Sequence, residues 1–497
     1  MSTLIQKNGQ TAEDAVLYGN PKMTYFKKVF MKKRNYTAYY SKLSKKVDNI
    51  QFGDKNITIQ IPNAGDLLGG IYIDFRLNDL VRKEFYNDIN NKLDTSKESR
   101  FTSYVNGIGF NIIDRIDLLI NGITIQSLTG ELIYLLNQLH ADSNKLKHFN
   151  TMTNYHDNFI IGKGNGILKG RTNNTSVRCQ LPIPFFFSKD PGQYLPLCNL
   201  ENILIQIKIT LKPFTKCIVK RSNINNSSVV EGVNGYIINN SHLEPNGRTV
   251  NETEFYNEEL DNLHYNDNNI SINQNVNMIE SFDVFTRVIY MDPDESRFFK
   301  SKDTLQYLVD IFHEGIPQEI KNPNSNSFYT VNIESNHPTK YLLWILQRED
   351  VFNDNHYQNY TYKYSAKYGN GLTQPDTTKH IIDSVKITLD GIPLFENINP
   401  VIISNIMKYD HLKGSADESI YIYNMSLNPD DVEPSGSINL SSYRDKLIEY
   451  SVSEDAVKEI NNDVADSESK GIIFRHYVAY FNILNIVSGT GANLVYT

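Results

Sequence analysis

The side chains that most often carry chemistry are present, but the chain does not group them into a recognised motif. Eleven histidines occur singly, without the H-E-x-x-H or H-x-H spacing that places two imidazoles on one metal ion. There is no C-x-x-C, no G-x-S-x-G and no Walker-type lysine loop. His313, beside Glu314, is expected to cap a helix rather than to catalyse. The sequence therefore predicts no enzyme, with no catalytic, cofactor-binding or metal-binding residue and no cofactor.

The composition of the chain narrows the classes of protein to which it can belong. Hydrophobic residues make up 40% and charged residues 21% of the 497 residues, as in globular proteins. A net charge of −8 argues against a chain built to bind nucleic acid. Three cysteines are too few for a disulfide framework and fit a reducing compartment. The first 20 residues lack the apolar segment of a secretion signal, and no apolar run reaches the ~18 residues of a membrane helix.

Two loop-like segments could bind anionic groups. The glycine-rich stretch GKGNGILKG (162–170) lacks both the spacing of a phosphate cradle and a following helix, and is expected to be a loop. Residues 23–46 combine Tyr and Phe with a series of basic residues, which are Lys27, Lys28, Lys32, Lys33, Arg34, Lys42, Lys45 and Lys46. Such a segment could contact an anionic membrane or nucleic acid, or it could be a strand with a solvated basic face.

The elements that must position any site are mostly strands. Apolar residues alternate with polar ones in many short segments, which is typical of antiparallel sandwiches and barrels. DRIDLLINGITI (114–125) and DSVKITLDGIPL (383–394) carry the same pattern around Asn-Gly and Asp-Gly, the strongest short hairpin signal. Helices are predicted over 129–143, with Leu132, Leu135 and Leu139 on one face, and over 294–312.

The hairpin is one of three matches between the two halves. TIQIPNAGDLLGGIYI (58–73) parallels TVNIESNHPTKYLLWI (330–345) at an offset of 272, and 185–197 parallels 423–440. Their common order predicts a duplicated antiparallel β-domain. Residues 216–276 are expected to form a long exposed loop in the first copy, and 453–471 an acidic surface loop in the second.

The same segments resemble a known family, the double jelly-roll major capsid proteins of nucleocytoplasmic large DNA viruses. The matching segments include GNPKMTYFKKVFMKKRNYT (19–37), RIDLLINGITIQSLTGELIYLLNQL (115–139), LPIPFFFSKDPGQYLPLCNL (181–200) and YIYNMSLNPDDVEPSGSINLS (421–441). The last is the most specific, and the matches run in family order from residue 19 to 497. The inserts at 216–276 and 453–471 depart from the family pattern.

The resemblance implies an all-β fold of two consecutive eight-stranded antiparallel jelly rolls with a few short helices in loops. It divides the chain into an arm (1–24), a first jelly roll (25–292) with its insert, a connecting helix (293–312) and a second jelly roll (313–497). It further implies a structural major capsid protein whose trimers form pseudo-hexagonal capsomers of an icosahedral shell. Assembly is expected in the host cytoplasm, without secretion.

The implied partners are two other copies, neighbouring capsomers and minor capsid proteins. An inner membrane is a further candidate, reached through Lys27, Lys28, Lys32, Lys33 and Arg34, and no specific nucleic-acid binding is expected. Two alternatives stay open. One is a minor capsid protein or capsid-like scaffold paralogue of the same virion. The other is a carbohydrate-binding or carbohydrate-active β-sandwich protein, which usually shows paired carboxylates or aromatic platforms.

Overall fold

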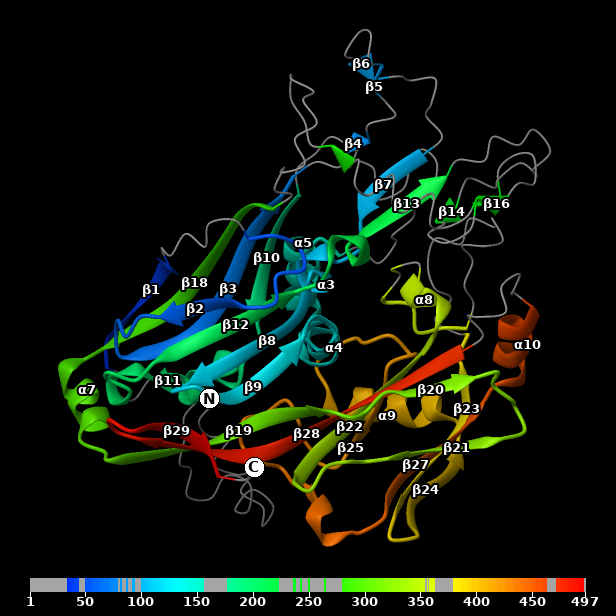
Figure 1. Cartoon of the computed structure of the whole chain (residues 1–497). Helices are drawn as coiled ribbons and strands as arrows, with labels where there is room; N and C mark the ends of the chain where they lie inside the picture. The colour runs from blue at the N-terminus through cyan, green and yellow to red at the C-terminus, as the bar shows by residue number, and fades with distance from the viewer. Residues whose placement is uncertain are drawn as a thin grey trace, which may run out of the picture.

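The computed structural model describes residues 34–43, 50–78, 100–155, 177–222, 279–353, 355, 357–362, 379–462 and 471–495, with short strands between 81 and 93 and between 236 and 264. These residues form two β-barrels that lie side by side, the first to the upper left and the second to the lower right of Figure 1.

The first barrel is built from two facing sheets. The order of one sheet is β1 (Tyr36–Leu43), β18 (Ile279–Met291), β3 (Leu67–Leu77) and β10 (Val177–Ile183), and β11 (Leu195–Pro196) also pairs with β3. The order of the other is β2 (Ile57–Ile61), β12 (Ile205–Leu211), β8 (Ile113–Ile120) and β9 (Ile123–Thr129). All neighbours are antiparallel, and the alternating burial of ITIQI in β2 follows the period of a strand with one face in the core.

The second barrel repeats this order. One sheet runs β19 (Thr304–Glu314), β28 (Gly471–Val487), β22 (Pro338–Arg348) and β25 (Tyr421–Asn424), extended by β20 (Gln318–Lys321), β26 (Ile438–Asn439) and β29 (Gly491–Leu494). The other runs β21 (Phe328–Asn332), β27 (Lys446–Val452), β23 (Ile382–Leu389) and β24 (Ile392–Ile398). In both barrels the first, eighth, third and sixth barrel strands share one sheet, which is the order of a jelly roll. The predicted all-β double jelly roll is confirmed.

The repeated hairpins occupy equivalent places in the two barrels. They are β8–β9 and β23–β24, and both central residues of each turn have positive φ: 51° at Asn121 and 80° at Gly122, then 47° at Asp390 and 77° at Gly391. These values are those of a type I′ turn, whose twist matches that of the flanking strands.

The predicted register of the second match is wrong by one residue. β3 and β22 are both 11 residues long and begin 271 residues apart, not 272. Each also leaves one residue unpaired at a bulge, Gly69 in β3 and Lys340 in β22. A slip of one residue exchanges the two faces of a strand, so only the offset of 271 places Ile73 and Trp344, both buried, on the inward face.

The helix predicted over 294–312 is also wrong in its second half. The helix α7 (Pro293–Lys300) is followed at once by β19, which pairs with β28 along its whole length. The segment after α7 has the period of a strand, since its apolar residues occur at every second position: Leu305, Tyr307, Val309 and Ile311. The helical pattern of the residues just before it obscured this period in the sequence. His313 therefore lies in a strand opposite Val478 and caps no helix.

Two of the predicted loops contain regular structure. β13 (Ile218–Ser222) opens the insert at 216–276 and pairs with β7 (Arg100–Tyr104), and β14 (Tyr236–Ile237) joins them in a small sheet. This sheet projects from the first barrel at the top of Figure 1, far from α7. The acidic segment at 453–471 begins as the helix α10 (Glu454–Asn462), because Ala456 and Ile460 pack into the core of the second barrel.

The cores explain the long apolar run in β22. Leu342, Trp344 and Leu346 face the interior of the second barrel, where Trp344 stacks on Tyr421 with ring centroids 6.0 Å apart. Leu343 and Ile345 face the other way and belong to the cluster that fills the first barrel. Because both faces of β22 are buried, the strand reads YLLWIL instead of alternating.

Candidate functional site at the junction of the two barrels

The helix α4 (Gly130–His140) follows β9 directly and lies where the two barrels meet. Thr129 caps it, since its hydroxyl accepts a hydrogen bond from the Leu132 amide at 3.3 Å. Glu131 stands in the first turn, where the helix dipole favours a carboxylate, and His140 ends the last turn. Both side chains reach residues of the second barrel, so α4 positions the polar groups of the junction.

At the first turn, Glu131 binds Arg475 of β28. The two guanidinium nitrogens of Arg475 donate to the two carboxylate oxygens of Glu131, one of them at 2.8 Å, and Arg475 also donates to Gln347. The Tyr477 hydroxyl donates to Glu131 Oε2 at 2.8 Å. The Arg475 and Glu131 side chains are only 14% and 12% exposed, so this forked ion pair is largely removed from water.

The ionisation of this network follows from its burial and its partner charges. Burial alone would lower the pKa of Arg475, but Glu131, together with Tyr477, Tyr360 and Glu314, outweighs burial and the pKa is raised. Burial raises the pKa of Tyr477 well above its ordinary value, and the neighbouring Glu131 charge raises it further. Arg475 is therefore charged and Tyr477 is a neutral donor across the physiological range.

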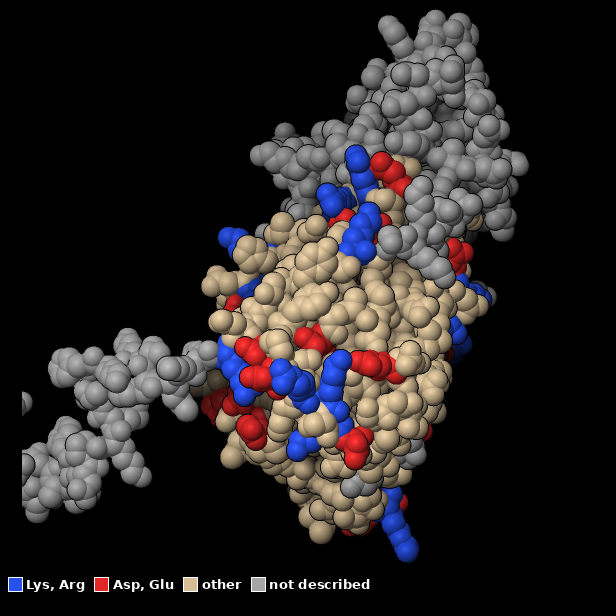
Figure 2. Space-filling view, turned by 90° about the vertical axis from the view of Figure 1, so that its left-hand side faces the viewer, with Lys and Arg blue, Asp and Glu red and all other residues tan. Residues whose placement is uncertain are grey.

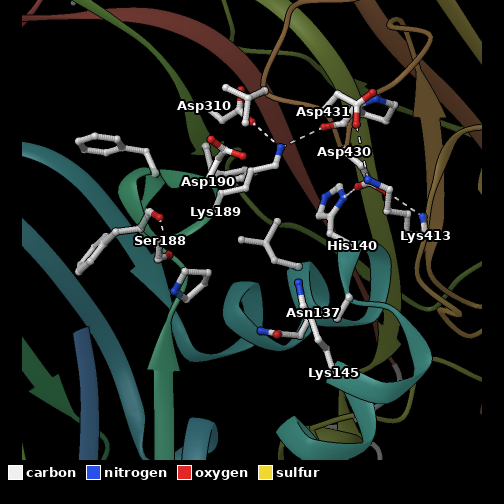
Figure 3. Close-up of a pocket in the computed structure, with 18 of the residues that line it drawn as sticks. Asn137, His140, Lys145, Ser188, Lys189, Asp190, Asp310, Lys413, Asp430 and Asp431 are labelled. Carbon is white, nitrogen blue, oxygen red and sulfur yellow. Dashed lines mark hydrogen bonds and ion pairs between the residues drawn. The ribbon is translucent and has the colours of Figure 1, made fainter. Parts of the chain in front are cut away.

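At the other end of α4, charged side chains from both barrels line a cavity of about 410 Å³ (Figure 3). His140 Nδ1 lies 2.5 Å from Asp430 Oδ1, and His140 Nε2 lies 2.8 Å from the Tyr341 hydroxyl. Burial would raise the pKa of Asp430, but the hydrogen bond and charge of His140 lower it overall. His140 thus ties the first barrel to two separate segments of the second.

Lys189 and Asp310 also line this cavity, and Lys340 lies beside it and shares their contacts. Lys340 Nζ donates to Asp310 Oδ2 at 2.7 Å and to the Pro429 carbonyl at 3.1 Å, and Lys189 reaches the same two acceptors at 3.3 and 3.2 Å. Figure 3 shows Lys189 and Asp310 pointing toward each other from different barrels. Burial lowers the pKa of Lys340, while Asp310 opposes the shift.

These groups bind one another rather than a reactant. Glu131, Asp310 and Asp430 each accept from a basic side chain of the other barrel or of the cavity wall. Within the described residues, no group of three or more His, Cys, Asp or Glu has the arrangement of a metal site. Burial raises the pKa of Cys198 to about 11 and that of Cys217 to about 12, so neither thiol is a reactive thiolate. The arrangement can fasten two barrels together.

The residues singled out in the sequence fall elsewhere. Lys27, Lys28, Lys32 and Lys33 lie outside the described residues, as does the stretch 162–170, whereas Arg34 is described and exposed. Lys42 on β1 pairs with Asp283 at 2.7 Å. Gly436, two residues after Pro434, has a φ of 117°. None of the described helices is long and apolar enough to span a membrane.

Glu131, His140, Asp430 and Arg475 were not predicted from the sequence. Glu131 and Arg475 are 344 residues apart, and neither belongs to a spaced motif. The only local signals were a carboxylate in the first turn of a largely apolar helix and an arginine inside a strand with many apolar residues. Buried charges of this kind are rare unless they are paired.

Comparison with known proteins assigns the fold to a family. The family profile described as "Major capsid protein N-terminus" matches residues 24–256, and the one described as "Large eukaryotic DNA virus major capsid protein" matches residues 297–492. The two matches follow the order of the two barrels and together take in most of the chain. The chain belongs to the double jelly-roll major capsid proteins of large DNA viruses. As a capsid protein it is a structural component of the virion shell and not an enzyme.

Its capsid relatives are distant in sequence but match along the whole length. The chain is 21% identical to the "Major capsid protein" of Paramecium bursaria Chlorella virus 1 over 97% of this chain and 96% of the relative. It is 21% identical to "Probable capsid protein 4" of Acanthamoeba polyphaga mimivirus, covering 98% of each. Among solved structures, PBCV-1 VP54 matches with a TM-score of 0.65 at 19% identity, covering 95% of this chain and all of that one. The Faustovirus major capsid protein matches with a TM-score of 0.61 at 12% identity, covering 98% and 96%.

Proposed function

We propose that three copies of the chain close into a ring of six barrels, a pseudo-hexagonal capsomer that tiles an icosahedral shell. The observation that carries this proposal is the repeated topology, which gives each chain two similar barrels in tandem. A cyclic arrangement would cover strand edges that otherwise stay open. In the part of the chain that is described, the edge strand β1 pairs with β18 alone and exposes Tyr36, Tyr39 and Tyr40.

The mass of the assembled protein tests this proposal directly. Light scattering on the purified protein is expected to give a particle near three times 57.0 kDa, with a hexagonal outline in negative stain. Obligate interfaces of this kind commonly bury more than about 2,000 Å², so the trimer should persist on dilution to micromolar protein. A stable monomer or a two-fold dimer at these concentrations would contradict the ring.

The proposed domains at 25–292 and 313–497 follow the two barrels, except that the proposed connection at 293–312 contains most of β19, which is a strand of the second barrel. We further propose that the sheet of β7, β13 and β14 belongs to an outward-facing projection of the capsomer. Its support is its position on the end of the first barrel away from α7 (Figure 1). Protease cleavage confined to residues 216–276 on intact particles is the expected result. Resistance of the insert on particles would argue against outward exposure.

The basic stretch containing Lys27, Lys28, Lys32, Lys33 and Arg34 is proposed to contact an acidic partner beneath the shell, either minor capsid proteins or the inner membrane. Its support is its charge, together with the exposure of Arg34 where the described chain begins. Replacing these five residues with Gln should leave trimers intact and lower the yield of closed particles assembled in the host cytoplasm. Normal particle yield would remove the need for such a contact.

A second candidate is a capsid paralogue with a minor or scaffolding place in the same virion. The chain is equally similar, at 21% identity, to a "Major capsid protein" and to "Probable capsid protein 4", which supports the paralogue as a second candidate. Quantitative mass spectrometry of purified particles separates the two. The major shell protein is expected to be the most abundant chain, whereas a paralogue would be present in a small fraction of the copies.

A further inference from the structure

The helix that fastens the two barrels has a counterpart in the second barrel whose apolar face is exposed among the residues that the structure describes. α9 (Pro400–His411) follows β24 as α4 follows β9, and the residue before each helix caps it: Asn399 accepts from the Val401 amide and Thr129 from the Leu132 amide. Aligning the caps makes Gly130, Tyr134 and Gln138 equivalent to Pro400, Ser404 and Lys408, and all six are buried. The two helices therefore seat on their own barrels through the same three positions.

The opposite faces of the two helices differ sharply in exposure. Leu132, Leu136 and Leu139 of α4 are 3%, 6% and 0% exposed, within the cluster that also contains Tyr341, Leu343 and Tyr477 of the second barrel. Their equivalents on α9, which are Ile402, Ile406 and Tyr409, are 56%, 52% and 90% exposed. Three large apolar side chains spaced at i, i+4 and i+7 form one stripe along a helix. In the first barrel the same stripe is an interface.

The surface that α4 covers also has a counterpart. α4 covers the outer face of the β19-β28-β22-β25 sheet, and the equivalent sheet of the first barrel is β1-β18-β3-β10. With the offset of 271 between β3 and β22, Leu343 corresponds to Tyr72. Leu343 pairs with Tyr477, and Tyr72 pairs with Phe285, so Tyr477 corresponds to Phe285. Tyr72 and Phe285 are both half-buried, and Tyr40 beside them is 58% exposed.

The outer face of this sheet combines an apolar part around Tyr72 and Phe285 with two neighbouring ion pairs, Lys42–Asp283 and Arg178–Asp74. Figure 2 views the molecule from the side that carries β1 and β18 in Figure 1, and it shows a broad area without charged side chains next to a mixed band of Lys, Arg, Asp and Glu. Two exposed aromatic side chains of β1, Tyr36 and Tyr40, lie on the same face as Phe285, whereas Tyr39 and Tyr290 alternate onto the other face of the sheet. Exposed apolar patches of this kind mark interaction surfaces.

We infer that the Ile402–Ile406–Tyr409 stripe of α9 docks on the outer face of the β1-β18-β3-β10 sheet of a second copy of this chain. This inference rests on the proposed ring and adds the surfaces that close it. The contact between chains repeats the contact within the chain, with α9 in place of α4 and Tyr72 and Phe285 in place of Leu343 and Tyr477. The contact is heterologous, so each copy presents one stripe and one sheet face, as a cyclic trimer requires.

Substitution of the stripe tests the inference by sedimentation velocity over a range of protein concentrations. Ile406→Asp places a carboxylate at the centre of the stripe and should weaken association by about 30-fold or more, as loss of an interface hot spot does. Tyr40→Asp should do the same from the other side. Because both side chains are more than half exposed in the single chain, circular dichroism and thermal midpoints should stay at wild-type values. Ile316→Asp is the matched control, since Ile316 is 68% exposed but lies on neither surface.

A cross-link tests the pairing of the two surfaces. The three native thiols are buried, so an introduced pair of cysteines is selectively labelled by a short bis-maleimide reagent. Ile406→Cys combined with Tyr72→Cys should give covalent dimers and trimers, whereas each single variant should stay at 57.0 kDa. A monomeric wild-type protein would overturn the ring itself. A wild-type trimer that is unaffected by Ile406→Asp and Tyr40→Asp and yields no cross-link would overturn the docking surfaces alone.

Discussion

The strongest single test of the barrel junction is removal of the Glu131 charge. Glu131→Gln keeps the size of the side chain but takes away the carboxylate to which Arg475 and Tyr477 donate. One amide oxygen would remain, while the amide NH₂ would face donors. Arg475 would keep Gln347 as its nearest side-chain acceptor, in a place where its side chain is only 14% exposed. A buried guanidinium would thus lose the carboxylate to which it is hydrogen-bonded, with Glu314 as the remaining acidic group nearby.

The expected cost follows from that burial. Removing one partner of a buried ion pair typically lowers the free energy of unfolding by about 3–5 kcal/mol, because the remaining charge is left desolvated. The matched control is the pair Lys300–Glu201, whose N–O distance is 2.7 Å but whose side chains are 48% and 61% exposed. Pairs of that kind contribute about 0–1 kcal/mol, so Glu201→Gln should have little effect.

Urea denaturation followed by both circular dichroism and tryptophan fluorescence measures both effects, since circular dichroism reports both barrels. The chain has one tryptophan, Trp344, and it lies in the core of the second barrel, so its emission reports the unfolding of the barrel that carries Arg475. A double-mutant cycle with Glu131→Gln and Arg475→Met should give a coupling energy of about 2 kcal/mol or more. The cycle with Glu201→Gln and Lys300→Met should give less than about 1 kcal/mol. Equal coupling in the two cycles would refute the claim that the buried pair holds the junction.

Three further predictions concern the second barrel. His476 is 1% exposed, and burial, with a smaller contribution from nearby His313, lowers its pKa to about 4. The unfolded chain, with a His pKa of about 6.5, binds more protons between these values, so the free energy of unfolding should fall by about 3 kcal/mol as pH drops from 7 to 4; if His476→Phe leaves this slope unchanged in urea titrations, His476 is not its source. Gly391→Val should cost about 1–2 kcal/mol through its φ of 77°, since an added Cβ meets no atom within 4 Å, and an unchanged urea midpoint would exclude backbone strain there. Ile460→Ala should cost about 2–4 kcal/mol if α10 seats its apolar face in the core, whereas Lys458→Ala on the exposed face should change the midpoint little; equal effects of the two would contradict that packing.

Local chemistry was enough to predict the hairpins but not the register around them. Asn-Gly and Asp-Gly specify a type I′ turn through backbone sterics alone, and both turns have the expected positive φ values. The predicted alignment of β3 with β22 is wrong by one residue because the outward residues of β22 are apolar too. The sequence therefore does not show which alternate residues of β22 face the core. That ambiguity is itself a consequence of the junction, which buries the outer face of the sheet.

The same reasoning explains why the candidate site was invisible in the sequence. A buried ion pair is recognisable by its geometry, and the halves of this one come from residues 344 positions apart. Strands that pair with remote partners are equally hard to find. β13 of the insert is stabilised by β7, so the composition of the insert alone suggested a loop. α9 was overlooked for a different reason, because its run VIISNIM is as typical of a buried strand as of a helix.

The two copies of the barrel differ in charge at the positions that α4 and its counterpart α9 bring to a contact. Glu131 on α4 corresponds to Val401 on α9, and Arg475, which pairs opposite Ile345, corresponds to Asp283, which pairs opposite Asp74. A contact of α4 with the sheet of another first barrel would therefore bring Glu131 toward Asp283 and Asp74, which already pair with Lys42 and Arg178. A contact of α9 with another second barrel would leave Arg475 facing an apolar residue. Both wrong pairings carry a desolvated or repelled charge, which is an effective way to exclude a partner. In the proposed ring, the polar pair thus selects the contact within the chain, and the apolar stripe of α9 is left for the contact between chains.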